Sequence, residues 1–321
     1  MDQWILDTYN DSFPEQKYAF LGTVNWMKAL GIYIEQTDFD KKIESTYQNI
    51  ERAQKDKQRD LKVFENLLMS YHNHASLRAL SQSGLNPYDI SRIAIVSWYY
   101  SIYFGGSAMI AALMGESYDT HTKTADVWLK NLIPPKLILP PFNFHLNSLV
   151  QTDVDTSITE LREGNTHLLW KTPFNLNDAR GAILSYLKGS AKFERTKVEE
   201  KLLSSKEFKR HELSDFRKKI AQEKRDEQLA KKGVSFLHQA FRYRGKVNYR
   251  DSLFLTYGEV HTKMVEQLLK DLFIVSGGFQ KMCIRYIKVR LPKESWSLFE
   301  QDLNKNTRLS LKFNYWDKIN Y

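Results

Sequence analysis

Cysteine is almost absent from this chain of 321 residues, in which Cys283 is the only thiol. A single cysteine excludes an internal disulfide framework and any metal centre built from several cysteines of one chain. This composition is typical of a reducing compartment and predicts a cytoplasmic protein. The first seven residues also lack the basic and apolar regions of a secretory signal, so we expect no export.

Signatures of several enzyme classes are missing as well. The sequence has no glycine-rich phosphate loop followed by Lys and Ser or Thr, no Gly-x-Ser-x-Gly elbow and no His-Glu-x-x-His helix. His72 and His74 lie two positions apart, so on a helix they diverge and do not share a metal ion. We therefore expect neither a metal nor an organic cofactor.

Charged side chains are missing from the segment between Ile93 and Gly115, which is 23 residues long. That length is sufficient to span a membrane, but the middle of the segment carries several Tyr and Ser residues, and no basic cluster flanks one side. The pattern is more typical of a central helix that is buried on all sides. We predict such a helix from about Pro87 to Met114 and expect no membrane partner.

Apolar residues make up 42% of the chain and aromatic residues 13%, which is ample for a buried core. Helical periodicity predicts an all-α fold without repeats or low-complexity tracts. We expect an N-terminal helical extension over 1–84, with one long helix from about Asp40 to Leu80. A helical bundle over 85–291 follows, with a proline-rich irregular insertion at about 133–176 and a helix break at Ser276-Gly-Gly278. Residues 292–321 are expected to form a short helix and an extended tail.

The net charge of +9 is concentrated in one fifth of the sequence. Between Lys188 and Asp251 there are 19 Lys and Arg residues against 10 Asp and Glu, whereas the rest of the chain has 28 of each sign. A localised basic stripe is the electrostatic pattern expected for a polyanionic partner. We therefore expect Lys218 and Lys219 to contact nucleic acid. The alternative is a pair of solvated helices with mixed charges.

The segment from Phe236 to Asp251 combines this charge with aromatic rings on a helical period. One face forms a core stripe: Phe236, Ala240, Tyr243, Val247 and Phe254. A different face carries His238, Arg242, Gly245 and Tyr249. Gly inside a helix costs about 1 kcal/mol relative to Ala, which suggests that something approaches the backbone at Gly245.

Cations interleaved with aromatic rings suit RNA or single-stranded nucleic acid. We expect four cations to engage phosphates, namely Arg242, Arg244, Lys246 and Arg250, and two rings to stack or orient, namely Tyr243 and Tyr249. The alternative is structural: Arg244 would pair with Asp251, and His238 and Tyr249 would be hydrogen-bonded neighbours within the bundle.

Two segments together resemble the HEPN superfamily, helical-bundle proteins of prokaryotic toxin and antiviral defence systems. They are Val96–Leu113 with the following Thr120-His121, and Arg244-Gly-Lys-Val-Asn-Tyr-Arg-Asp251; with their surroundings they cover about a third of the chain. The resemblance implies a cytoplasmic RNA-directed protein that forms a homodimer. In the family's ribonucleases, which need no metal, His handles the 2′-hydroxyl proton and Arg, four to six residues away, stabilises the phosphate.

The position that this His would occupy after Arg244 holds Tyr249, which is a poor base at neutral pH because the pKa of tyrosine is near 10. The literal spacing occurs instead at Arg162-Glu-Gly-Asn-Thr-His167, inside the irregular insertion. If the insertion folds over the Arg242 face, His167 would supply the missing base; His238 and His121 are the other candidates.

We therefore predict an RNA-directed, nucleic-acid-binding protein of a bacterial defence or toxin-like system, which is the first of three hypotheses. The second is an active ribonuclease of the kind just described. The third is an interaction subunit of a defence complex that holds a partner protein through the polar Glu51–Asp60 stretch and the basic helices.

Overall fold

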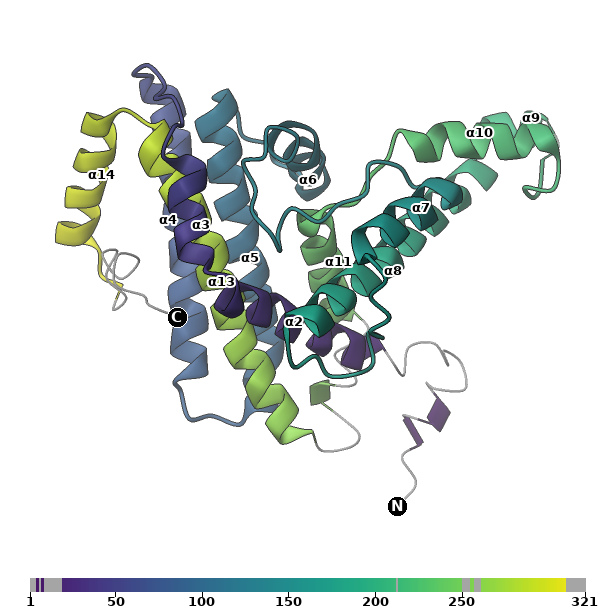
Figure 1. Ribbon diagram of the computed structural model, residues 1–321, viewed down its shortest axis with the longest axis horizontal. Helices are drawn as coiled ribbons and strands as arrows, with labels where there is room; N and C mark the ends of the chain where they lie inside the picture. Colours follow the sequence, from purple (N-terminus) through teal and green to yellow (C-terminus); the bar gives the residue numbers. More distant parts are fainter. Residues whose placement is uncertain are drawn as a thin grey trace.

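The computed structural model describes residues 4–5, 7–8, 19–211, 213–249, 255–256 and 261–309. All regular secondary structure in these ranges is helical, which confirms the predicted all-α class. Three long helices lie side by side as the main bundle (Figure 1): α4 (Lys57–Ser81), α5 (Pro87–Met114) and α13 (Thr262–Arg290). The extended tail expected after residue 309 lies outside the described ranges.

Shorter helices surround this bundle. Helix α2 (Ala19–Gln36) and helix α3 (Phe39–Tyr47) cross α13, while α14 (Lys293–Asn306) lies on the outer side. Helix α6 (His121–Val127) runs into a π-helical turn, η2 (Trp128–Leu132), and α11 (Phe236–Tyr249) packs against α5.

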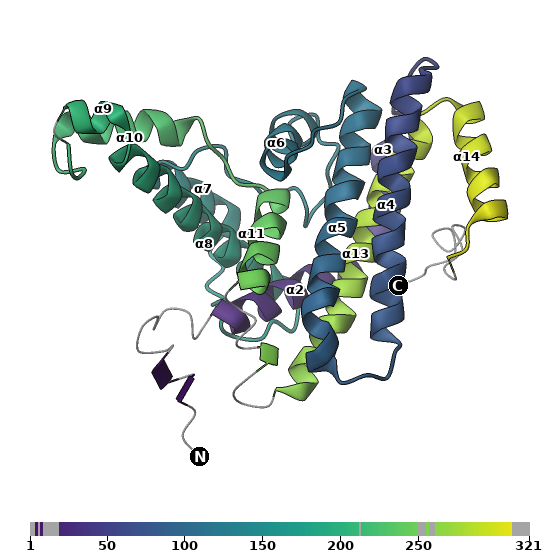
Figure 2. The same ribbon diagram turned by 180° about the vertical axis from the view of Figure 1, so that it is seen from behind.

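The remaining helices form a projecting arm on the side opposite α14 (Figures 1 and 2). They are α7 (Gln151–Arg162), α8 (Leu176–Leu203), α9 (Lys206–Arg210) and α10 (Lys219–Ala230). The arm has its own apolar packing, because Leu184, Leu187 and Leu229 belong to a cluster separate from the main core. A further small cluster around Phe208 lies toward the end of the arm.

Helix α5 is the buried central helix that the sequence predicts. Its start is fixed by Asn86, whose side chain accepts a hydrogen bond from the backbone of Tyr88, and by Pro87 in the first turn. Its end is fixed by Gly115, whose φ of 76° is a left-handed conformation that favours glycine. By length and composition α5 would suffice to cross a membrane, but 67% of its most apolar window is buried inside the fold.

The N-terminal helices are part of the same core and do not form a separate extension. Trp26 of α2, Tyr47 of α3 and Leu67 of α4 are buried in one cluster with Trp98 of α5. The expected single helix from Asp40 to Leu80 is also interrupted between α3 and α4. The polar segment at the interruption docks on the end of α13, where the backbone N–H of Ala53 donates to the carbonyl of Arg290 at 2.7 Å.

A further expectation about helix limits is wrong. Helix α13 continues through Ser276-Gly-Gly278, because Gly278 serves a close helix crossing and not a break. A Cβ atom at Gly278 would lie 2.9 Å from Cδ1 of Ile34 on α2, so only glycine lets the two helices approach this closely. The insertion at 133–176 contains one short helix of three turns, α7.

A buried polar network joins the three long helices. The amide nitrogen of Gln280 donates to Ser70 and Ser101, and the Ser101 hydroxyl lies 2.8 Å from that of Ser276. His74 completes the network, with Nδ1 2.9 Å from the Ser276 hydroxyl and its ring stacked on Phe273. Burial lowers the pKa of His74 to about 3, so the imidazole is neutral in the folded protein.

We predict that His74 makes the protein acid-labile. The unfolded chain protonates His74 below pH 6.5, whereas in the folded protein His74 stays neutral down to about pH 3. The free energy of unfolding therefore falls as the pH drops from 6.5 toward 3. The loss from this site is about 1.4 kcal/mol per pH unit. In urea unfolding between pH 7 and 5, a His74→Gln variant should show a flatter pH dependence than wild type. His72→Gln, on the exposed side of α4, is the control; equal slopes in all three proteins would contradict the prediction.

Candidate nucleic-acid interface

Helix α11 occupies the centre of the molecule, between α5 and the arm (Figures 1 and 2). Its predicted core stripe is confirmed for the described part, because Phe236, Ala240, Tyr243 and Val247 are all buried. Tyr243 packs against Trp26 and Trp98, with ring centroids 6.0 and 5.8 Å away. Its ring is therefore a core element and does not face a ligand, contrary to the expectation that it stacks on a base.

Arg244 projects from α11 toward α5. Its Nη1 donates to the hydroxyl of Tyr100 at 3.0 Å. The guanidinium carbon lies 5.1 Å from the ring centroid of Tyr99 and 5.2 Å from that of Phe241. No carboxylate of the described residues forms an ion pair with Arg244, and its buried Nε has no hydrogen-bond partner there. Within the described part of the chain, Arg244 is thus a half-buried cation held by rings and a hydroxyl.

His121, the first residue of α6, belongs to the same cluster. Its Nδ1 lies 2.7 Å from the hydroxyl of Tyr99, and its ring stacks on Phe241 with centroids 5.2 Å apart. Burial lowers the pKa of His121, and the nearby Arg244 guanidinium lowers it further. The structure therefore brings the arginine of the expected motif next to a neutral histidine that comes from the other segment of the HEPN resemblance.

Arg242 points to the opposite side of α11. Its Nη1 donates to the Ser190 hydroxyl at 3.1 Å, and its guanidinium carbon lies 4.4 Å from the centroid of Phe193 on α8. The separation has a simple cause, since residues two positions apart on a helix are rotated by about 200°. Arg242 and Arg244 thus line two different faces, one at the base of the arm and one at the bundle.

The end of the arm carries the most concentrated positive charge. Seven of its cations are exposed: Lys201, Lys206, Lys209, Arg210, Arg217, Lys218 and Lys219. The same stretch contains three acidic residues. Phe208, which is fully buried, holds the helical turns of the tip together, so the cations are presented on a folded scaffold. Lys218 and Lys219, predicted to contact nucleic acid, both lie on this exposed tip.

The literal Arg-x-x-x-x-His spacing forms a structural turn between α7 and α8. Arg162 donates to the backbone of Asn165 and to the hydroxyl of Ser185. The ring nitrogens of His167 lie 3.3 Å from a carboxylate oxygen of Asp178 and 3.1 Å from the carbonyl of Lys171. Within the described part of the chain, the hydrogen bonds and ion pairs of Arg162 and His167 stay in this turn and on α8, and none reaches α11.

His238 fixes the start of α11. The backbone N–H of Ser235 donates to Nδ1 of His238 at 3.2 Å, and Nε2 lies 3.3 Å from a carboxylate oxygen of Asp126 on α6. Because Nδ1 accepts a hydrogen bond, the proton of the neutral ring sits on Nε2 and is directed at Asp126. This hydrogen bond lowers the pKa of the Asp126 carboxyl. His238 therefore ties α11 to α6 and holds the helix that bears Arg244.

The remaining predicted residues are located in part. Lys246 is half-buried on α11, and the backbone of Tyr249 closes this helix. The side chain of Tyr249, together with Arg250, Asp251 and Phe254, lies outside the described residues. At Gly245 no described atom lies within 4 Å of where a Cβ would be, so the expected close approach does not come from this part of the fold.

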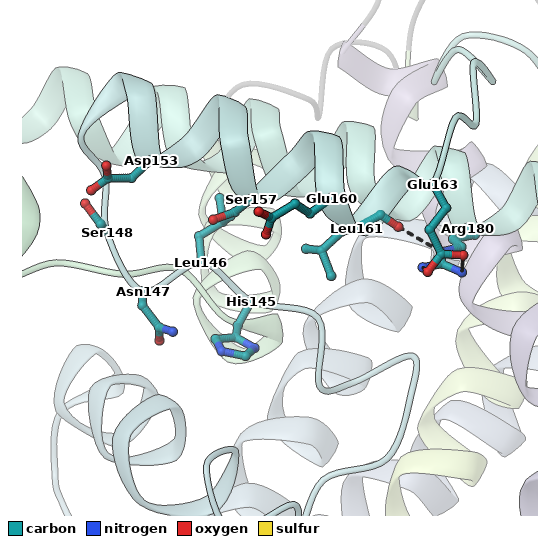
Figure 3. A pocket seen from close by; sticks show the side chains of 10 residues that line it. All are labelled: His145, Leu146, Asn147, Ser148, Asp153, Ser157, Glu160, Leu161, Glu163 and Arg180. Atoms are coloured by element: carbon teal, nitrogen blue, oxygen red, sulfur yellow. Dashed lines mark hydrogen bonds and ion pairs between the residues drawn. The ribbon is translucent and has the colours of Figure 1, made fainter.

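A groove of about 470 Å³ runs along α7 (Figure 3). Asp153, Ser157 and Glu160 line it from one face of the helix, and His145 faces them from the preceding loop. At one end Arg180 makes two hydrogen bonds to Glu163, at 2.9 and 2.7 Å. The acidic lining of this groove repels phosphate. No group of three potential metal ligands occurs among the described residues.

Sequence reasoning missed the rings that hold the two arginines. Tyr99 and Tyr100 are adjacent on α5, so they point about 100° apart: Tyr99 is buried, whereas Tyr100 is half-exposed next to Arg244. The available signal was a tyrosine pair inside the charge-free run between Ile93 and Gly115. Phe193, which lies under Arg242, had no comparable signal, because its role depends on how the arm packs against α11.

No family model matches the chain, and no curated protein or solved structure is significantly similar to it.

We predict that Arg244 tunes the protonation of His121. Replacing Arg244 by Gln removes a positive charge beside the imidazole, so the pKa of His121 should rise toward 6.5. A pH titration of the histidine ring signals by NMR measures this change. Arg242→Gln is the matched control, because Arg242 lies against α8, and it should leave the His121 titration unchanged. Identical His121 titrations in wild type and Arg244→Gln would contradict the electrostatic coupling.

Proposed function

We propose that this protein binds single-stranded RNA, with the exposed tip of the arm contacting the phosphate backbone and Arg244 anchoring the strand at the bundle. The observation that carries the proposal is the cluster of seven exposed cations at the tip, 201–219, which lies within 188–251, the segment that accounts for the net positive charge of this chain. Contacts between lysine or arginine and phosphate release counterions and supply most of the affinity for a polyanion.

The aromatic surroundings of Arg244 and Arg242 favour an unpaired strand over a duplex. Tyr100, Phe241 and Phe193 are half-exposed rings that lie beside these two guanidinium groups. Unstacked bases of single strands stack on such rings, whereas the bases of a duplex are inaccessible to them. A cytoplasmic role in bacterial antiviral defence or in a toxin-like system, with two copies sharing the RNA, is proposed from the HEPN resemblance alone.

We predict that loss of four cations at the tip weakens RNA binding strongly. The variant is Lys209→Ala, Arg210→Ala, Lys218→Ala, Lys219→Ala. Fluorescence anisotropy with labelled single-stranded RNA at several salt concentrations should show at least tenfold weaker binding near 0.1 M salt. The slope of log K against log salt should fall by about two to three.

A control variant of equal charge separates this effect from a change in net charge. It removes four exposed cations near α14 and the start of α4, on the far side of the molecule (Figure 1): Lys57→Ala, Lys293→Ala, Lys305→Ala, Arg308→Ala. The control should bind RNA within about twofold of wild type. Equal losses in the two variants, or binding that is insensitive to salt, would refute the proposed phosphate contacts.

RNA cleavage without a metal is a second candidate function, which the pairing of His121 with Arg244 specifically favours. In the tautomer whose Nδ1–H donates to Tyr99, Nε2 of His121 carries the lone pair that a general base requires. Its lowered pKa keeps the ring neutral at pH 7. Arg244 would then stabilise the charge that develops on the phosphate as the 2′-oxygen attacks.

We predict that any cleavage in excess EDTA depends on His121 and Arg244. End-labelled RNA should yield cyclic-phosphate fragments with wild type, and His121→Ala should lower the rate by about a hundredfold or more. His167→Ala, in the turn between α7 and α8, should cleave at the wild-type rate. Loss of activity in His167→Ala instead would place the base in that turn, and intact RNA with wild type would leave binding as the function.

A further inference from the structure

A pocket of about 460 Å³ opens beside the Arg244 cluster, between α4, α5 and the loop that leads to α6. Three of its walls are rings on successive turns of α5, namely Tyr100, Tyr103 and Phe104. The His121 ring forms a further wall, with its centroid 4.4 Å from that of Tyr103. Part of the pocket lining is therefore aromatic and includes the histidine of the candidate site.

The lining of this pocket also has polar residues. They include Glu65 and Asn66 of α4 and Asp119 of the loop before α6. Asn66 donates from Nδ2 to the carbonyl of Lys62 at 2.8 Å, so its Oδ1 atom provides an acceptor. A flat ligand that stacks on the rings and directs N–H groups to these polar residues matches this arrangement. Nucleobases have both properties, since each has a π-face and an edge with hydrogen-bond donors.

The charges around the pocket include three cations. Arg244 lies with its guanidinium carbon 5.8 Å from the centroid of Tyr100, and Lys123 lies with its ammonium 5.5 Å from that of Tyr118. Lys62 donates to the carbonyl of Gly115 at 3.1 Å, close to the same loop. These three cations offset the two carboxylates of the lining, Glu65 and Asp119, and they favour a base whose phosphate lies on the Arg244 side of the pocket.

We propose that this pocket takes an unpaired nucleobase of the bound RNA, stacked on the α5 rings, with Arg244 next to the attached phosphate. This inference deepens the proposed function and rests on it. The arm then supplies affinity that is independent of sequence, whereas the pocket holds one nucleotide in register beside His121.

The test uses the four nucleoside monophosphates as probes of the whole 321-residue chain. Saturation-transfer NMR at 0.3 M salt should show transfer mainly to the base protons of at least one nucleotide. Two variants should abolish it or weaken it at least fivefold: Phe104→Ala, which removes a wall, and Ser117→Trp, which fills the pocket from its exposed rim. The four-cation arm variant, whose substitutions all lie outside the pocket lining, should retain the signal.

The outcomes separate the pocket from the arm. One outcome is that no nucleotide shows transfer, although the wild-type protein still binds RNA with steep salt dependence. This result would refute the proposed nucleobase pocket and leave the proposed function standing. Transfer that persists in both Phe104→Ala and Ser117→Trp would also refute the nucleobase pocket. A further outcome is that the wild-type protein binds nucleotides but not longer RNA, and that both variants lose the nucleotide binding. This result would support the nucleobase pocket and refute the function proposed for the arm.

Discussion

Helix α5 carries no charged side chain between Ile93 and Gly115, so nearly every turn of it has to be covered by another helix. Helices α4 and α13 cover two of its sides, and α11 and α6 cover much of the rest. Trp98 of α5 is fully buried by this packing. The ring centroids of Trp26, Phe236 and Tyr243 lie no more than 6.2 Å from that of Trp98. The positions of the surrounding helices follow from this one requirement.

The same requirement builds the candidate site. Where α6 and α11 meet α5, the cover is made of rings: Tyr99, Phe241 and His121 contact one another and leave Arg244 between them. His238 and Asp126 then fix α11 relative to α6. Among the described residues no carboxylate pairs with Arg244, and a buried charge is costly unless something compensates it. In this part of the chain, the rings and a tyrosine hydroxyl compensate the charge in part.

Features that depend on one helix or on composition were predictable from the sequence. The charge-free run predicted the burial of α5, the helical period predicted the core stripe of α11, and the local excess of Lys and Arg predicted a basic surface. Features that depend on how helices meet were not. Gly278 was interpreted as a break because its role is set by Ile34, which lies more than 200 residues away in the sequence. The approach of His121 to Arg244 likewise arises only when α6 and α11 pack on the same side of α5.

Photo-crosslinking of 4-thiouridine-substituted single-stranded RNA, followed by mass spectrometry of the attached peptides, tests the proposed interface most directly. If one strand runs from the tip of the arm to the Arg244 cluster, crosslinks should fall on peptides within 201–219 and on the α5 peptide that contains Tyr100, Tyr103 and Phe104. Crosslinks concentrated on α14 or on the acidic face of α7, with none on α5 or the arm, would contradict a nucleic-acid interface at this place.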